Sequence, residues 1–312
     1  MELVIDTDTA ADDAVALVLA ASTPGIRLAA VTTVAGNVPV DLATRNAAWA
    51  LQVGGRDDVP LYSGAAGPLR RQLVTGQDVH GESGMGDARP PDGLRAADQG
   101  FAAQELVRAA IQRPGELTLV TLGPLTNIAI AVLLDPLFLT RFARVVVMGG
   151  APDAHGNVTP VAEYNFWADP EAVDIVLRAA GELELVGWDV SRQAAVITDE
   201  EAALLAAKRT PKSRFVLEAT AALDRYCRTE QGLAGFDLPD PVAVAVAMHP
   251  GIVTSAHRLP VSIMVEQEAR GQLQVDRRGR PSGRWVRVIE GVDRQAFLNC
   301  LMDACELEGA AA

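Results

Sequence analysis

The chain has 312 residues, of which 49% are hydrophobic and only 4% aromatic. Forty acidic residues against 27 basic ones give a net charge of −13, which excludes sequence-independent nucleic-acid binding through clustered cations as the expected function. No apolar run reaches the roughly 18 residues that a membrane span needs, and the N-terminus lacks the pattern of a signal peptide. Cys227, Cys300 and Cys305 form no metal-binding or disulfide pattern. We therefore expect a cytoplasmic protein with neither a membrane nor a nucleic-acid partner.

The first half of the chain alternates short apolar runs with longer amphipathic, alanine-rich ones. This alternation predicts a mostly parallel, doubly wound sheet with helices on both faces. Strands are expected over residues 3–5, 28–34, 117–121, 145–148 and 183–186. Helices are expected over residues 13–21, 42–53, 101–111, 125–134 and 170–180.

The second half predicts helices over residues 199–207, 212–226, 241–249 and 292–307, and short strands over 261–265, 273–275 and 285–289. The glycine, proline and arginine turns between these strands favour a small antiparallel element. Because no linker or repeat interrupts the chain, we predict one α/β domain over residues 1–312, with a Rossmann-like sheet and appended helices. Two polar stretches, residues 80–93 and 149–169, are expected to be functional loops.

Four carboxylates lie within eight residues where the first strand should end and the first helix begin: Asp6, Asp8, Asp12 and Asp13. Ligands of open parallel sheets bind at such strand ends. Like charges this close stay ionised together only when something positive lies among them, and a divalent cation with oxygen ligands satisfies that need. The alternative is that Asp12 or Asp13 caps the helix and the remaining carboxylates are solvated.

Several segments carry a family resemblance. They are Asp6-Thr7-Asp8 with Asp12-Asp13, Val34-Ala35-Gly36-Asn37, Thr44-Arg45-Asn46-Ala47, His80-Gly81-Glu82-Ser83-Gly84, Leu122-Gly123-Pro124-Leu125-Thr126-Asn127, Met148-Gly149-Gly150, Glu163-Tyr164-Asn165-Phe166, Ala168-Asp169-Pro170 and Asp240-Pro241. Together they resemble the conserved blocks of the nucleoside hydrolases, the inosine–uridine-preferring N-ribohydrolases. The blocks appear in the family's order and cover about residues 3–247, so the combination is specific although each block alone is weak.

The resemblance implies a Ca²⁺-dependent hydrolysis of the N-glycosidic bond of ribonucleosides, giving free base and ribose. It implies calcium ligands at Asp8, Asp13, the backbone carbonyl of Leu122 and Asp240, all hard oxygen donors. Asp8 is further implied as the general base that deprotonates the attacking water. For Asp240 an alternative role is to cap a helix before Pro241. The resemblance also implies a homodimer or homotetramer.

The resemblance assigns the ribose hydroxyls to polar side chains from several blocks. These are Asp12 and Asn37 at the 2′ side, Asn165 and Asp240 at the 3′ side, and Asn157 and Glu163 at the 5′ end, with Met148 and Phe166 completing the substrate site. Turn formation within a polar loop is the alternative for Asn157 and Asn165. A site built to bind hydroxyls should reject 2′-deoxynucleosides.

The chain departs from the family where the leaving base should be protonated. Members place His or Trp immediately before the last metal-binding Asp, whereas this chain has Pro239. His80 is the candidate acid, with an exposed loop histidine as its alternative. Tyr226, Trp167 and Trp188 are candidates to contact the base, although such aromatics more often pack in the core. The base preference stays open.

Two other functions are considered. Asp6-x-Asp8 after a strand resembles the nucleophile motif of haloacid-dehalogenase-type phosphatases, but Lys208 and Lys212 lack the context that those enzymes require. The second is a catalytically weak homologue that binds ribose or nucleosides, an alternative that Pro239 keeps open.

Overall fold

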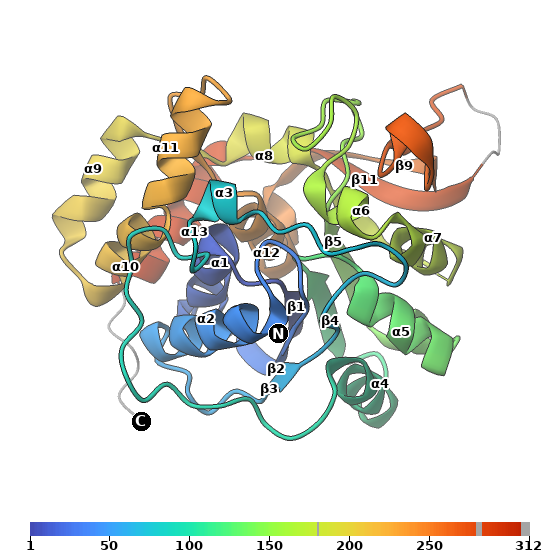
Figure 1. The fold of residues 1–312 in the computed structure, drawn as a ribbon, viewed down its shortest axis with the longest axis horizontal. Coiled ribbons are helices and arrows are strands. Elements are labelled where there is room, and N and C mark those ends of the chain that lie inside the picture. The colour runs from blue at the N-terminus through green and yellow to red at the C-terminus, as the bar shows by residue number, and fades with distance from the viewer. Residues whose placement is uncertain (180, 279–282, 307–312) are drawn as a thin grey trace.

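The computed structural model describes residues 1–179, 181–278 and 283–306, and its central feature is a nine-stranded, mostly parallel sheet (Figure 1). The strands lie in the order β10-β9-β11-β6-β5-β4-β1-β2-β3. Their bounds are β1 (Glu2–Thr7), β2 (Arg27–Thr33), β3 (Leu61–Ser63), β4 (Leu117–Thr121), β5 (Arg144–Met148), β6 (Glu184–Val186), β9 (Val253–Ile263), β10 (Leu273–Val275) and β11 (Arg284–Val292). A separate antiparallel pair is formed by β7 (Val196–Thr198) and β8 (Gly235–Asp237).

Helices cover both faces of the sheet, as Figure 1 shows for α1 and α2 on one side and α4 and α5 on the other. The helices are α1 (Ala11–Ser22), α2 (Val40–Val53), α3 (Gln77–His80), α4 (Ala102–Gln112), α5 (Thr126–Leu134), α6 (Tyr164–Ala168), α7 (Pro170–Ala179), α8 (Trp188–Ala194), α9 (Asp199–Lys208), α10 (Pro211–Ala219), α11 (Ala221–Thr229), α12 (Pro239–Met248) and α13 (Arg294–Glu306). Three 3₁₀ turns are η1 (Phe138–Arg141), η2 (Pro250–Ile252) and η3 (Gln267–Ala269).

The side chains of β1 divide between two hydrophobic cores because successive residues of a strand point to opposite faces. Leu3 and Ile5 pack with α1, α2, α10, α12 and α13, whereas Val4 packs with α4, α5 and α7. The predicted doubly wound α/β fold is therefore confirmed, with a buried sheet between two helical layers.

The strand order reverses direction at β1. From β1 the chain first builds outward through β2 and β3, and then returns to add β4, β5 and β6 on the other side. Connections therefore diverge between the carboxyl ends of β1 and β4, which leaves a crevice there. Asp8 follows β1 and Leu122 follows β4, so the fold brings two of the predicted metal ligands to this crevice.

The predicted antiparallel element is present, but it extends the main sheet. Strand β11 pairs parallel with β6 and antiparallel with β9, and β10 pairs antiparallel with β9. Strand β9 begins at Val253, eight residues before the predicted start at residue 261. The prediction missed this part because Pro260 interrupts the pattern. The proline is tolerated because β10 pairs only with Val261–Ile263, so β9 has a single strand neighbour before that point.

The single helix predicted over residues 212–226 is wrong, since α10 and α11 are separated by Thr220. Thr220 adopts φ −88° and ψ 1°, and its hydroxyl donates to the carbonyl of Val216. Such a hydroxyl competes with the helical backbone for its acceptors, which explains a break that hydrophobic periodicity does not signal. The predicted helices over 170–180 and 292–307 each include a final residue outside the described parts of the chain.

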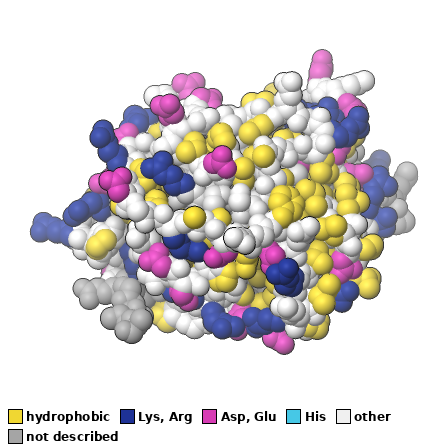
Figure 2. Space-filling view, turned by 60° about the horizontal axis from the view of Figure 1, so that its bottom comes forward, with side chains coloured by type: hydrophobic (Ala, Val, Ile, Leu, Met, Phe, Trp, Pro, Cys, Tyr) yellow, Lys and Arg dark blue, Asp and Glu magenta, His cyan; other side chains and the backbone are white. Residues whose placement is uncertain are grey.

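The surface carries both signs of charge. On the face shown in Figure 2, Lys and Arg side chains are interspersed with Asp and Glu, and hydrophobic side chains gather toward one side. Within residues 1–179, 181–278 and 283–306, no helix has the length and apolar character needed to cross a bilayer.

Candidate active site

A cavity of about 260 Å³ lies at the carboxyl ends of the central strands. Its wall includes Leu122 directly after β4, Met148 at the end of β5 and Trp188 directly after β6. Asp12 contributes from the first turn of α1. The cavity therefore occupies the crevice that the reversal of strand order creates.

Asp8 is fully buried behind this wall and held by backbone. The Asn37 N–H donates to Asp8 Oδ2 at 2.6 Å, while Asp8 Oδ1 has no hydrogen-bond partner among the described residues. Gly36 and Gly123 allow this approach: a Cβ on Gly36 would lie 2.1 Å from Oδ2, and one on Gly123 would lie 2.8 Å from Oδ1. Burial, reinforced by the charge of Asp13, raises the pKa of the Asp8 carboxyl well above its usual value.

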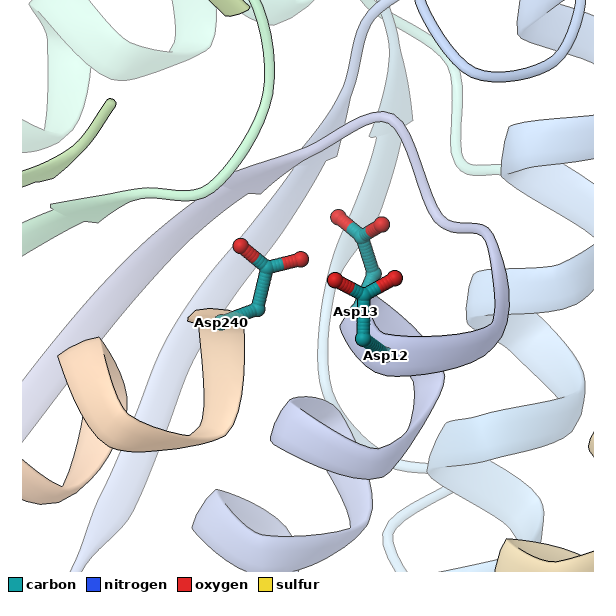
Figure 3. A group of neighbouring side chains, drawn as sticks. All are labelled: Asp12, Asp13 and Asp240. Carbon is teal, nitrogen blue, oxygen red and sulfur yellow. The ribbon is translucent and has the colours of Figure 1, made fainter. Parts of the chain in front are cut away.

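Asp12, Asp13 and Asp240 form a buried acidic cluster, shown in Figure 3. One carboxylate oxygen from each lies within 4.8 Å of the others. Asp13 is oriented by the Thr7 hydroxyl and the Ala10 N–H. Burial raises the pKa of both Asp12 and Asp13 to about 6.

Asp240 belongs to α12 and reaches the cluster from the opposite side to α1. Burial raises its pKa well above the usual value, and the charges of Asp13, Asp12 and Asp8 raise it further. The alternative role as a helix cap is wrong, because α12 begins at Pro239 and its N-cap is Leu238. Carboxylates this close together and this well shielded from water could hold a divalent cation.

Asp6 lies behind the cluster, where the Thr32 hydroxyl and the Asn127 side-chain amide both donate to its Oδ1. Asn127 also donates to the Thr33 carbonyl and accepts from the Ala65 N–H, so it links the ends of β1 and β2 to the following loop. Asp6 and Asn127 thus support the site from below, outside the cavity lining.

Glu163 organises the loop between β5 and α7. Its carboxylate caps α6 by accepting from the N–H groups of Asn165 and Phe166, and it also accepts from the Gly150 N–H at 2.7 Å. Asn165 Nδ2 in turn donates to the Leu122 carbonyl at 2.6 Å. Burial raises the pKa of Glu163 to about 7 although these N–H groups act to lower it.

The structure brings most of the predicted substrate residues to one cavity. Its lining includes Asp12, Asn37, His80, Leu122, Met148, Asn157, Glu163, Asn165 and Asp240. Asn157 Oδ1 also accepts from the Tyr164 N–H at 2.9 Å, so the turn role considered as its alternative is present as well.

Phe166 is a correction to the predicted site. Its side chain is 1% exposed and packs in the hydrophobic core on the α4, α5 and α7 side of the sheet, outside the cavity lining. The short helix α6 turns successive side chains by about 100°, so Trp167 rather than Phe166 reaches the cavity. The Arg270 guanidinium lies 4.1 Å from the centre of the Trp167 ring and holds it.

Another part of the cavity lining is more apolar. It includes Trp188, Leu223, Tyr226, Cys227 and Pro239. His80 is buried, its Nδ1 lies 3.7 Å from Asp12 Oδ1, and burial lowers its pKa to about 4. The sequence-based alternative of an exposed loop histidine is therefore wrong.

Among the residues of this wall that sequence reasoning missed is a carboxylate, Asp237. It is 1% exposed, lines the cavity from β8 and accepts from the Ser191 hydroxyl at 2.7 Å. The available signal was an acidic residue between the apolar Phe236 and Leu238, since a carboxylate flanked in this way is rarely buried without a function.

Comparison with known proteins places these features in context. Residues 3–299 match the family described as inosine-uridine preferring nucleoside hydrolase. The chain is 36% identical to a pyrimidine-specific ribonucleoside hydrolase, RihA, of Shewanella woodyi, over 97% of each chain. It is 35% identical to the inosine-uridine preferring nucleoside hydrolase of Crithidia fasciculata, over 99% of this chain and 98% of that one. A purine-preferring ribonucleoside hydrolase from Gardnerella vaginalis superposes with a TM-score of 0.91 at 30% identity, over 98% of each chain.

Proposed function

The chain belongs to the inosine-uridine preferring nucleoside hydrolase family, and we propose that it is a Ca²⁺-dependent enzyme in which Asp8 activates the attacking water. As a ribonucleoside hydrolase it cleaves the N-glycosidic bond between base and ribose. Because the chain belongs to this family, the phosphatase function considered from the sequence is wrong. The relatives carry pyrimidine, purine and mixed preferences in their names, so they leave the preferred base of this chain open.

The residues of the site fit a hard divalent cation. Asp8 Oδ1 and Asp12 Oδ1 are buried acceptors without a donor in the part of the chain that the structure describes. Leaving such oxygens unmatched is costly unless a cation or water meets them. We propose that Asp8, Asp13, the Leu122 carbonyl and Asp240 hold Ca²⁺, since Asp13 and Asp240 belong to the buried acidic cluster and Asp8 Oδ1 is unmatched. When bound, the cation would neutralise the carboxylates and polarise the attacking water.

Asp8 is suited to accept the proton of that water. Its Oδ2 is fixed by the Asn37 N–H, which leaves Oδ1 as the free oxygen. As the C1′–N bond breaks, positive charge develops on the ribose, as in other glycoside hydrolyses. The surrounding carboxylates favour that charge, so they stabilise the transition state more than the neutral substrate.

The ribose-binding role is proposed for the polar side chains of the same wall. Asp12 and Asn37 would bind the 2′-hydroxyl, Asn165 and Asp240 the 3′-hydroxyl, and Asn157 and Glu163 the 5′-hydroxyl. Glu163 already accepts three backbone N–H groups. A carboxylate has about four acceptor positions, so one remains for a substrate hydroxyl.

We also propose that the protein assembles as a homodimer or homotetramer. Leu133, Leu134 and Leu137 are 65%, 55% and 58% exposed on and just after α5. Adjacent exposed leucines favour burial against another protein surface. Light scattering on the purified protein measures its molar mass and distinguishes these states from a monomer.

The buried acidic cluster with its unmatched oxygens is the observation that carries the proposed function. The test measures release of free ribose from inosine and uridine by the Ca²⁺-loaded protein and by Asp8→Asn. Loss of a general base lowers kcat by about 10²- to 10⁴-fold, while nucleoside binding should persist. Asp189→Asn is a matched control, since Asp189 is a largely buried carboxylate outside the cavity lining. A wild-type rate in Asp8→Asn would exclude the general-base role.

A further inference from the structure

The proposed function leaves one chemical task to be assigned, the protonation of the departing base. His80 is the candidate from the sequence, but burial lowers its pKa to about 4, which leaves it mostly unprotonated near neutral pH. Pro239 has no proton to give. In the proposed function, six polar side chains already bind the ribose or the cation: Asp12, Asn37, Asn157, Glu163, Asn165 and Asp240. Burial raises the pKa of the Cys227 thiol to about 12, which makes it a poor acid near neutrality.

Asp237 has the position that this task requires. It is buried, it lines the cavity from β8, and it lies three residues before Asp240 on the connection into α12. Ser191, on α8, fixes Oδ2 by its hydroxyl at 2.7 Å. Oδ1 has no partner in the described chain. One oxygen is thus held in place while the other is unmatched, as in a carboxyl group that exchanges a proton with a ligand.

The surroundings of Asp237 favour its neutral, proton-carrying form. The pKa of Asp237 is raised to about 7: burial and the charge of Asp12 on α1 raise it, and the Ser191 hydroxyl and the Arg192 charge on α8 only partly oppose them. Cys227, on α11, also faces Asp237. Gln231 Oε1 is another acceptor of the cavity lining that lacks a donor within the described residues. Protonation would convert one of these unmatched acceptors into a donor.

We propose that Asp237 is the general acid that protonates the leaving base, in place of the residue that Pro239 replaces. The proton moves from the Asp237 carboxyl to a ring nitrogen or carbonyl oxygen of the base as the C1′–N bond breaks, and the bonding electrons remain with the base. The water oxygen adds to C1′ while Asp8 takes one proton of that water, and the return of this proton through solvent to Asp237 restores both carboxyl groups. The net change is hydrolysis of one nucleoside to one base and one ribose. This inference rests on the proposed function and adds a residue to it.

The experiment compares two substrates that differ in their need for an acid. The base of inosine, hypoxanthine, leaves poorly unless it is protonated, whereas para-nitrophenyl β-ribofuranoside releases the stable para-nitrophenolate anion without an acid. For Asp237→Asn we expect kcat/KM on inosine to fall by about 100-fold or more and kcat/KM on the nitrophenyl substrate to fall by only about threefold. Asp189→Asn should show no such split, because Asp189 lies outside the cavity lining. Equal losses on both substrates would overturn the proposal.

The pH dependence gives a second measurement that needs no Asp237 variant. An acid must be protonated to act, so kcat/KM for inosine should fall as pH rises through about 7. The kcat/KM for the nitrophenyl substrate should not fall over this pH range. Ser191→Ala removes the hydrogen bond that stabilises the Asp237 carboxylate, so the fall in kcat/KM should move to higher pH. The proposal is contradicted if kcat/KM for inosine does not fall near pH 7, or if Ser191→Ala leaves the pH of that fall unchanged.

His80→Gln distinguishes the competing assignment. If His80 protonates the base, the split between inosine and the nitrophenyl substrate appears in His80→Gln and is absent in Asp237→Asn, which would overturn the proposal. Failure of the wild-type protein to release ribose from any nucleoside would instead refute the proposed function, whereas an active wild type with an unaffected Asp237→Asn refutes only the role of Asp237.

Discussion

Gly36→Ala tests whether Asp8 depends on the close approach of backbone. The added Cβ would lie 2.1 Å from Asp8 Oδ2, 2.7 Å from Asp8 Cγ and 2.8 Å from Pro124 Cδ. The φ of Gly36 lies outside the left-handed region, so the methyl group itself, rather than backbone strain, is the perturbation. Because Oδ2 accepts from the Asn37 N–H, the carboxylate cannot retreat without losing that hydrogen bond.

The expected magnitude follows from the displacement. To restore a normal contact from 2.1 Å, Asp8 Oδ2 must move by about 1 Å, and such a misplacement of a catalytic group costs about 100-fold in rate. Overpacking of a buried site also costs about 1–3 kcal/mol in the free energy of unfolding. We therefore expect a folded protein with a lower melting temperature and a kcat/KM for inosine reduced by about two orders of magnitude.

The assay combines thermal unfolding with ribose release at saturating Ca²⁺. Gly67→Ala is the matched control, because a Cβ at Gly67 meets nothing within 4 Å in the described structure and its φ is also unstrained. It should retain wild-type stability and rate. If Gly36→Ala folds and hydrolyses inosine as fast as Gly67→Ala, the position of Asp8 does not depend on Gly36 and the reasoning is refuted.

Three further predictions concern the metal, the ribose and the surface. Chelation of Ca²⁺ should abolish hydrolysis and lower the melting temperature, since a ligand at 1,000 times its Kd stabilises the fold by about 4 kcal/mol; activity that survives complete Ca²⁺ removal contradicts the metal mechanism. Deoxyinosine should be hydrolysed with a kcat/KM about 10³-fold below that of inosine, because Asp12 and Asn37 lose their 2′-hydroxyl; comparable values would exclude that assignment. Arg113 and Arg27 lower the pKa of Glu2 to about 2, so Glu2 stabilises the fold above its unfolded-state pKa of about 4.5 and loses this effect as pH falls toward 2. Glu2→Gln should therefore cost less than about 1 kcal/mol near pH 7, because the ion pairs of Glu2 with Arg27 and Arg113 lie partly exposed at the surface, and denaturant unfolding should show the difference vanish below about pH 2.

The sequence alone determined those features that depend on local order along the chain. The alternation of apolar strands with alanine-rich helices predicted the doubly wound sheet, because strand and helix periodicities differ and each element must bury one face. The acidic run begins at Asp6 near the carboxyl end of the first strand and continues to Asp13 in the first helix, so its place at a carboxyl end of the sheet was predictable before any contact was known. Resemblance in the later blocks then suggested partners for these carboxylates.

Tertiary structure decided what depends on direction and on distant contacts. Neighbours on a short helix point in different directions, which is why Phe166 enters the core while Trp167 reaches the cavity. The break at Thr220 depends on a side-chain hydrogen bond that competes with the helix and leaves the apolar pattern unchanged. In the sequence, Asp237 is distinguished only by its two apolar neighbours, Phe236 and Leu238. It becomes a candidate acid only because β8 and α8 pack it against Ser191 at the cavity wall and remove it from water, and desolvation is a property of the folded chain.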